Sequence, residues 1–292
     1  MGNERKAAGP LIGAHMSISG GVDKAPLRGR DVGCVCMQIF TKSNMQWASR
    51  PLGEQEIADF RKNCAETGIG PVMAHDSYLI NLASADSALA KKSLESFVEE
   101  LQRCEALGLP ALIMHPGSHA DEAEGLKRIA GAIDESLERT KGSKVKVLVE
   151  ATAGAGTNLG SRFEHLAQII SGVRQKARMG ACLDTCHMFA AGYDIRTEDG
   201  YQKTMQEFDK VVGLKRLGAF HFNDAKGELG RHLDRHEHIG HGKLGKEPFR
   251  LILQDERLDG VPKILETPKG MKGDQDWDAV SLKLLRGLAG RP

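Results

Sequence analysis

The chain has 292 residues, of which 40% are hydrophobic and 27% charged, and 40 Lys and Arg against 39 Asp and Glu leave a formal net charge of +1. This composition argues against a membrane protein, because no apolar run approaches the roughly 18 residues of a span. The near-zero charge argues against a protein that coats nucleic acid through bulk electrostatics. The first ten residues, MGNERKAAGP, lack a hydrophobic signal region, so we expect a cytoplasmic protein with reduced cysteines.

Short apolar or β-branched runs recur along the chain. They cover residues 11–17, 35–40, 71–76, 111–117, 145–152, 179–185, 217–224 and 261–267. Near-continuous hydrophobicity indicates strands that are buried on both faces, as in a parallel sheet. The sequence therefore predicts eight parallel strands.

Helical patterns fill the gaps between these runs. Leu94, Phe97 and Leu101 fall on one helix face, and Gly108 is placed to end that helix. Further apolar stripes run over residues 126–137, 163–173 and 205–212, and Pro248 suits the first turn of a later helix. Alternating strands and helices predict an α/β fold, a single-domain (β/α)8 TIM barrel over residues 11–292, with residues 1–10 as a flexible N-terminal extension. A doubly wound open sheet is the structural competitor.

Potential metal ligands stand at the ends of six successive runs. They are His75, His115, Glu150, Asp184, His221 and Glu266, and three more, His187, Asp234 and His236, lie in the following loops. Each alone is more often a structural residue. All strand carboxyl ends of a parallel barrel open on one face, however, so we expect the nine side chains to converge there.

Nine such groups in one place would repel or be costly to bury unless cations neutralise them. Five His and four carboxylates suit zinc, with manganese or iron also possible, and nine ligands suit two or three ions with a bridging carboxylate such as Glu150. Clustered ions without thiolate ligands can activate water and clamp a phosphoryl group. Phosphoester hydrolysis is therefore the leading reaction class, and metal-assisted sugar isomerisation is its main rival.

An ordered set of motifs resembles the endonuclease IV family, the apurinic/apyrimidinic endonucleases of DNA base-excision repair. The set includes GAHMSISGG (13–21), FTKSNMQW (40–47), AHDSYLINL (74–82), HPGSH (115–119), EATAGAGTNLG (150–160), LDTCHMFAAGYD (183–194), HFNDAKG (221–227), DRHEHIGHGKLG (234–245) and ILETPKG (264–270). The match runs from about residue 11 to about residue 285. Any one motif is moderately specific, but the ordered set is highly specific.

The resemblance implies a TIM barrel with three Zn²⁺ ions that incises the phosphodiester 5′ to an abasic site in double-stranded DNA. It leaves a 3′-hydroxyl and a 5′-deoxyribose phosphate. By resemblance, the first zinc is held by His75 and His115, with Glu150 bridging to the second; the second also takes Asp184, His221 and Glu266; the third takes His187, Asp234 and His236. Glu266 and Glu150 are the catalytic carboxylates, and Glu266 helps to orient the attacking hydroxide.

DNA contact is also implied by the resemblance. Tyr78 and Leu79 match positions in a loop that penetrates the minor groove, bends the duplex and flips out the abasic nucleotide. Met45 stands where the family commonly has an Arg that enters the base stack. Lys42 follows a barrel strand and is a candidate phosphate contact. The partner is duplex DNA, with no membrane, and the expected state is a monomer.

Three further positions bear on the site. Ala151 replaces the Asn that is usual after the bridging Glu, which could alter hydrogen bonding around Glu150. Cys186 is expected to point away from the metals as a packed thiol, and His15 is expected beside the ligands rather than among them.

Two functions compete with the nuclease. A sugar isomerase of the same barrel superfamily would use fewer ligands, which would make His187, Asp234 and His236 surplus. A DNA-damage binding protein that has lost turnover is a non-enzymatic alternative. The complete set of nine ligands argues against it, whereas Met45 argues in its favour.

Overall fold

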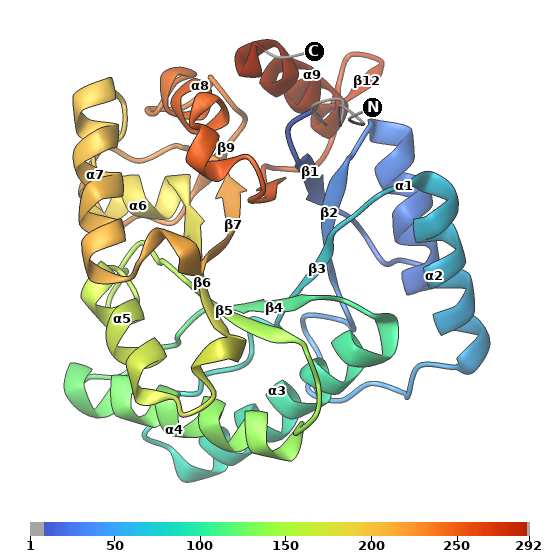
Figure 1. Ribbon diagram of the computed structural model, residues 1–292, viewed down its shortest axis with the longest axis vertical. Coiled ribbons are helices and arrows are strands. Elements are labelled where there is room, and N and C mark those ends of the chain that lie inside the picture. Colours follow the sequence, from blue (N-terminus) through green and yellow to red (C-terminus); the bar gives the residue numbers. More distant parts are fainter. Residues whose placement is uncertain (1–8, 291–292) are drawn as a thin grey trace, which may run out of the picture.

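The computed structural model describes residues 9–290, in which eight parallel strands close into a barrel surrounded by helices (Figure 1). The strands are β1 (Ile12–His15), β2 (Cys36–Phe40), β3 (Val72–His75), β4 (Ala111–Met114), β5 (Lys146–Glu150), β6 (Met179–Asp184), β7 (Leu217–Phe222) and β10 (Lys263–Leu265). Each predicted run contains one of them. Because β1 pairs with both β2 and β10, the sheet has no edge, and the closed barrel is confirmed over the open sheet.

The helices lie outside the ring of strands (Figure 1). They are α1 (Ala25–Val32), α2 (Glu54–Thr67), α3 (Ser87–Leu107), α4 (Glu122–Arg139), α5 (Phe163–Gly172), α6 (Thr185–Ala191), α7 (Glu198–Val211), α8 (Glu247–Gln254) and α9 (Trp277–Ala289). The prediction that Gly108 ends α3 is confirmed. Its φ of 78° is left-handed, and its N–H donates to the carbonyls of Cys104 and Glu105.

The apolar core has two parts. The larger part lies between the strands and the helix stripes, as the alternating pattern predicts. The smaller part fills the barrel interior and includes Met73, Ile113 and Leu148. Gly180 and Gly218 flank Leu148 so closely that an added Cβ would lie 2.6 and 2.7 Å from its methyl carbons. The absence of side chains at these two positions leaves room for the Leu148 side chain inside the barrel.

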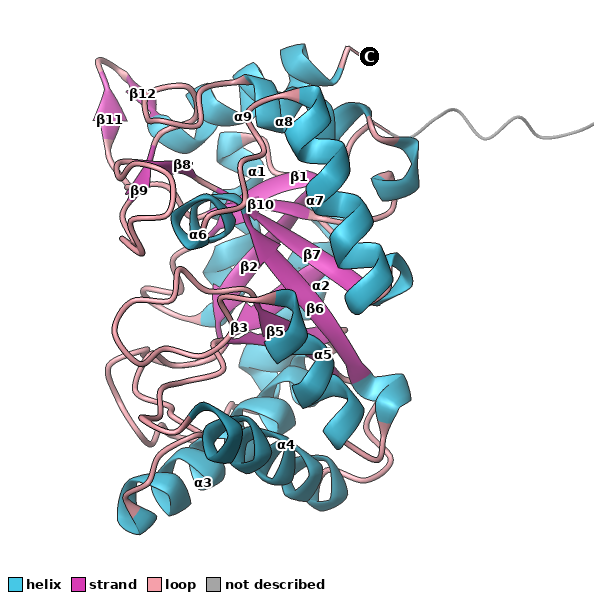
Figure 2. Ribbon diagram, turned by 90° about the vertical axis from the view of Figure 1, so that its left-hand side faces the viewer, coloured by secondary structure: helices cyan, strands magenta, loops and turns pink. Residues whose placement is uncertain are grey.

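Small elements gather at the carboxyl end of the barrel, where the longest loops also lie (Figure 2). A two-stranded ladder joins β8 (Asp224–Ala225) to β9 (His236–Glu237), and a second joins β11 (Met271–Lys272) to β12 (Gln275–Asp276). No sequence pattern predicts these two-residue ladders. They shape the loops that follow β7 and β10, which carry several of the expected ligands.

The N-terminal extension predicted for residues 1–10 lies mostly outside the described residues, and Gly9 and Pro10 lead directly into β1. Within residues 9–290, no helix has the length and apolarity that crossing a membrane requires.

Candidate metal centre

The nine expected ligands come from the carboxyl ends of six barrel strands and the segments that follow them. His75, Glu150, Asp184 and His221 lie within β3, β5, β6 and β7, and His115 and Glu266 directly follow β4 and β10. His187 lies in the first turn of α6, Asp234 precedes β9, and His236 begins β9. The predicted convergence is thus observed, and it follows from the parallel closure of the barrel.

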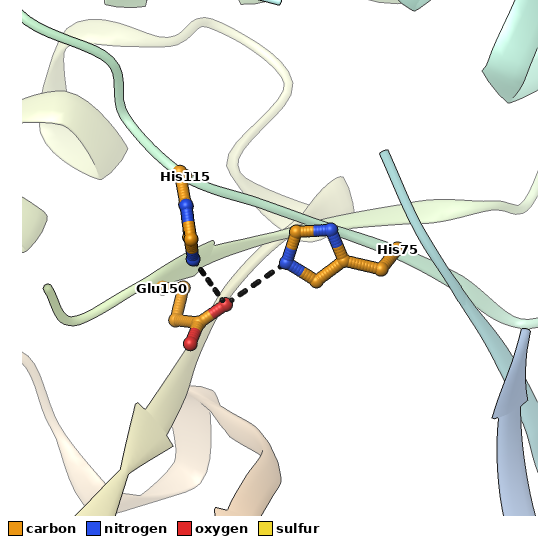
Figure 3. A group of neighbouring side chains, drawn as sticks. All are labelled: His75, His115 and Glu150. Carbon is orange, nitrogen blue, oxygen red and sulfur yellow. Dashed lines mark hydrogen bonds and ion pairs between the residues drawn. The ribbon is translucent and has the colours of Figure 1, made fainter. Parts of the chain in front are cut away.

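Two imidazoles face one carboxylate oxygen in the first group. Nε2 of His75 lies 3.1 Å and Nε2 of His115 lies 3.3 Å from Oε2 of Glu150 (Figure 3). Glu150 and His75 are buried, whereas His115 is partly open to solvent. Two nitrogen donors and one oxygen donor therefore point at a common position beside the fully buried carboxylate.

The other oxygen of Glu150 belongs to a second group. Nδ1 of His221 lies 2.9 Å from Oε1 of Glu150 and 3.2 Å from Oε2 of Glu266. Asp184 supplies a further oxygen, and one donor atom from each of these four residues lies within 4.8 Å of the others. Glu150 thus connects the first two groups, one carboxylate oxygen to each.

A third group joins α6 to the segment around β9. Asp234 Oδ1 lies 3.2 Å from Nε2 of His187 and 3.4 Å from Nε2 of His236. Both Nε2 atoms are buried, and neither makes a hydrogen bond to any described residue. Their contacts with Asp234 have ion-pair distances without hydrogen-bond geometry, and a cation between these three side chains would satisfy both nitrogens.

Backbone and side-chain acceptors fix which imidazole nitrogen faces each group. Nδ1 of three rings lies against a backbone carbonyl: His75 against Asp76 at 2.8 Å, His187 against Ala151 at 3.0 Å, and His236 against Glu266 at 3.1 Å. His221 is reversed, because its Nε2 lies 2.8 Å from Oε1 of Gln38. If each tethered nitrogen carries the proton, the other keeps a lone pair for a metal, the arrangement typical of ligating His.

The charges of the site favour ionised carboxylates. Burial alone would raise the pKa of Glu150, but the surrounding imidazoles, His221 foremost, hold it well below its ordinary value. Burial would likewise raise the pKa of Asp234, yet the contact with His187 lowers that pKa to about 2. Burial would lower the pKa of His75, but its contact with Glu150 raises it to about 9. A metal ion bound to Nε2 of His75 would take the place of a proton on that nitrogen.

The donor set fits catalytic divalent ions better than a structural site, because it consists of nitrogen and oxygen atoms. Cys186 agrees only in part with the prediction that it points away from the metals. Its Sγ is packed in the core and donates to the carbonyl of Arg235 at 3.7 Å, yet it lies within 4.8 Å of donor atoms of Asp184 and His236. Burial raises the pKa of this thiol to about 12, so it remains a neutral group beside the carboxylate.

Two buried amides position the ligands, and sequence reasoning did not single them out. Gln38 donates from Nε2 to Oε1 of Glu266 at 2.5 Å and accepts from His221. Asn223 donates to Oδ2 of Asp184 at 2.6 Å and accepts from the backbone N–H of Glu266. The available signal was a polar residue inside an apolar run. His15 lies 3.7 Å from Glu266, beside the ligands as expected.

The residues expected to contact DNA are placed differently from one another. Met45 is 69% exposed and Tyr78 is 59% exposed, whereas Leu79 is half-buried. The structure does not support the prediction that Lys42 contacts a DNA phosphate. Its side chain is buried, and its ammonium donates to the Trp47 carbonyl, Ser96 Oγ and Glu99 Oε2, each at 2.9 Å. The structure contradicts the phosphate contact, because all three N–H groups are already engaged within the protein.

The centre opens into a cavity of about 210 Å³ between the loops that follow β3, β4 and β5. Tyr78, His115, His187 and Asp234 line it together with the polar side chains of Ser118 and Asn158. A larger cavity of about 630 Å³ lies at the opposite end of the barrel around Met73, Leu148 and Gly218. We place the chemistry at the smaller cavity, because it adjoins the ligand groups.

The chain is similar to known proteins along most of its length. Residues 28–287 match the model of a family described as xylose isomerase-like TIM barrels. A protein of Geotalea daltonii named probable endonuclease 4 is 49% identical, over 95% of this chain and 97% of its own length. A protein of Chloroflexus aurantiacus with the same name is 49% identical over 96% and 98%.

The chain also superposes on solved structures along almost its whole length. The crystal structure of endonuclease IV from Thermus thermophilus superposes with a TM-score of 0.87 at 36% identity, over 97% of this chain and 100% of that one. A D-tagatose 3-epimerase-like protein superposes with a TM-score of 0.73 at only 17% identity, over 96% and 97%, a likeness that concerns the fold alone.

Proposed function

The chain belongs to the endonuclease IV family, and from this premise we propose that it is a metal-dependent DNA-repair endonuclease that cuts duplex DNA 5′ to abasic sites. The cut leaves a 3′-hydroxyl and a 5′-deoxyribose phosphate. The observation that carries the proposal is the convergence of nine nitrogen and oxygen ligands in three groups, two of which share Glu150. A sugar isomerase would have no use for the third group of His187, Asp234 and His236.

We propose that each group holds one zinc ion, with manganese or iron as alternatives at one or more positions. The three sets are His75, His115 and Glu150; Glu150, Asp184, His221 and Glu266; and His187, Asp234 and His236. Two observations support this occupancy. First, an acceptor lies against one nitrogen of each tethered imidazole, for example Nδ1 of His187 and of His236, and the other nitrogen of the ring faces the metal group. Second, Nε2 of His187 and Nε2 of His236 make no hydrogen bond to a described residue.

Bound divalent ions would lower the pKa of the attacking water and neutralise charge on the phosphate oxygens. The side chain of Glu266 is 15% exposed, whereas the side chains of Glu150 and Asp184 are fully buried. Glu266 is therefore the carboxylate of the second group best placed to accept a hydrogen bond from the attacking water and to orient it. Glu150 holds the first two groups at a fixed separation, and Gln38 fixes Glu266 through its amide.

DNA would be recognised by the carboxyl end of the barrel. Among the described residues, five large apolar side chains are exposed, and four of them, Met45, Tyr78, Leu233 and Met271, lie in segments that follow barrel strands at this end. We propose that Met45, Tyr78 and Leu79 enter the minor groove beside the lesion. Unstacking a duplex costs least where a base is already missing, so insertion would favour abasic sites.

A duplex with one tetrahydrofuran residue, a stable abasic analogue, tests the proposal. We expect the zinc-loaded protein to cut the strand immediately 5′ to the analogue and to leave an end that a DNA polymerase extends. Removal of metal by a chelator should abolish the cut, and added zinc should restore it. The matching duplex with thymidine at that position is the control. Failure of the zinc-loaded protein to cut the tetrahydrofuran strand would refute the proposal.

A further inference from the structure

One face of α3 holds the loop that carries Met45. Lys42 in this loop donates to Ser96 and Glu99, and Ser96 also donates to the Trp47 carbonyl. One turn further along the helix, Arg103 donates to the backbone carbonyls of Thr41 and Arg50. Both ends of the loop and its middle are therefore fastened to a single rigid helix.

The loop that carries Tyr78 is fastened to the same helix. Ser93 Oγ accepts a hydrogen bond from the backbone N–H of Asn81 at 3.0 Å, and Glu100 Oε1 accepts one from the backbone N–H of Ser77 at 3.1 Å. The other oxygen of Glu100, Oε2, accepts from Thr41 Oγ1 at 2.7 Å. One buried carboxylate thus bonds to both loops, one oxygen to each.

The two loops also touch each other directly. Ser77 Oγ donates to the Asn44 carbonyl at 2.7 Å, one residue before Met45 and one residue before Tyr78. Thr41, Ser77 and Glu100 are all buried, so water does not compete for these hydrogen bonds. The exposed side chains of Met45 and Tyr78 therefore stand on one polar cluster, here called the loop clamp, formed by Thr41, Ser77, Asn44 and Glu100.

We propose that Glu100 is a positioning residue whose carboxylate couples the Met45 loop to the Tyr78 loop, so that both side chains enter an abasic duplex as one preorganised unit. The proposal rests on the function proposed above, and none of the four clamp residues is among the metal ligands. The physical reason is entropic. Loops ordered before binding do not lose that freedom on the DNA, so a fixed pair binds more tightly than two independently moving loops.

A double-mutant cycle measures this coupling. Met45→Ala and Tyr78→Ala, singly and together, are compared for binding of a tetrahydrofuran duplex whose 5′ linkage is an uncleavable methylphosphonate. We expect the two effects to deviate from additivity by about threefold or more in the otherwise native protein, and to become additive in Thr41→Val, which removes one clamp bond. Ser77→Ala, which removes the bond between the loops, is the second disrupting variant and should act in the same way.

Thr140→Val is the matched control. Thr140 is also buried, donates to the Ser136 carbonyl and accepts from Arg178, but it lies after α4, away from the loops. We expect this variant to lose stability while keeping the coupling. Additivity in the native protein, or unchanged coupling in Thr41→Val and Ser77→Ala, would overturn the proposal.

A readout without DNA separates this proposal from the proposed function. In a Trp277→Phe background, Trp47 is the remaining tryptophan, and it lies on the Met45 loop with the ammonium of Lys92 4.5 Å from its ring. Thr41→Val and Ser77→Ala should shift the Trp47 emission and speed proteolysis in both loops, whereas Thr140→Val should not. Emission and cleavage rates equal to those of the control would refute the clamp, even if the native protein failed to recognise abasic DNA.

Discussion

Glu266 faces the second candidate metal group, and its side chain both accepts a hydrogen bond from Gln38 and keeps some exposure. Replacement by Gln keeps its size but removes the charge and one acceptor. We expect Glu266→Gln to abolish incision of the tetrahydrofuran duplex while leaving binding nearly intact. Glu228→Gln, in an exposed loop and paired with Lys243, is the control. Unchanged turnover in Glu266→Gln would remove its proposed role.

Met45 stands where the resemblance of FTKSNMQW to the family motif implies an Arg, and we propose that it contacts DNA. A thioether can wedge between bases but cannot donate hydrogen bonds or add charge. We expect Met45→Arg to tighten binding of the abasic duplex, measured as an equilibrium dissociation constant beside that of an intact duplex. Met271→Arg adds the same charge at another exposed Met of this face and should strengthen both equally. Equal or weaker abasic affinity of Met45→Arg would contradict the argument.

The ladder of β8 and β9 shows how a small element places a proposed ligand, His236. Ala225 pairs with His236, and the Asp224 carboxylate accepts from the backbone N–H groups of Gly240, Gly242 and Leu244. We expect Asp224→Asn to loosen this segment and lower the metal content from about three ions per chain to about two, because a neutral amide offers one acceptor oxygen instead of two.

The control for that variant is Asp255→Asn. Asp255 also has its carboxylate engaged, by Tyr201 and Arg257, but it lies at the end of α8. The Asp255→Asn variant should lose stability and keep its metal content. A full metal content in Asp224→Asn, measured by atomic emission after exhaustive dialysis, would show that the ladder does not position the third group.

The strands were predictable because each is a near-continuous apolar run, and α3, α4, α5, α7 and α8 because each has an apolar stripe or a Pro in its first turn, whereas α1, α2 and α9 were not predicted. The convergence of Glu150 with the other candidate ligands at strand ends was predictable because parallel closure brings those ends together, and His187, Asp234 and His236 were assigned to a third group because the motifs resemble a known family. The burial of Lys42 was not predictable, since it depends on hydrogen bonds to Ser96 and Glu99, more than fifty positions away on α3. Gln38 was missed for the same physical reason, because its partners come from β7 and from the residue after β10.

The charge of the whole molecule now has a structural interpretation. A net charge of +1 provides no general attraction for a polyanion. Three divalent ions would place six positive charges at the carboxyl end of the barrel, where Met45, Tyr78, Leu233 and Met271 are exposed. Affinity would then be concentrated on one shaped face, which suits recognition of a lesion better than coverage of intact DNA.

The claim on which the account depends is that the nine side chains form a three-ion centre. Anomalous diffraction at the zinc absorption edge, from crystals grown with zinc, tests it directly. We predict three peaks: one between His75, His115 and Glu150, one between Glu150, Asp184, His221 and Glu266, and one between His187, Asp234 and His236. A single peak, or no peak among these residues, would contradict the account.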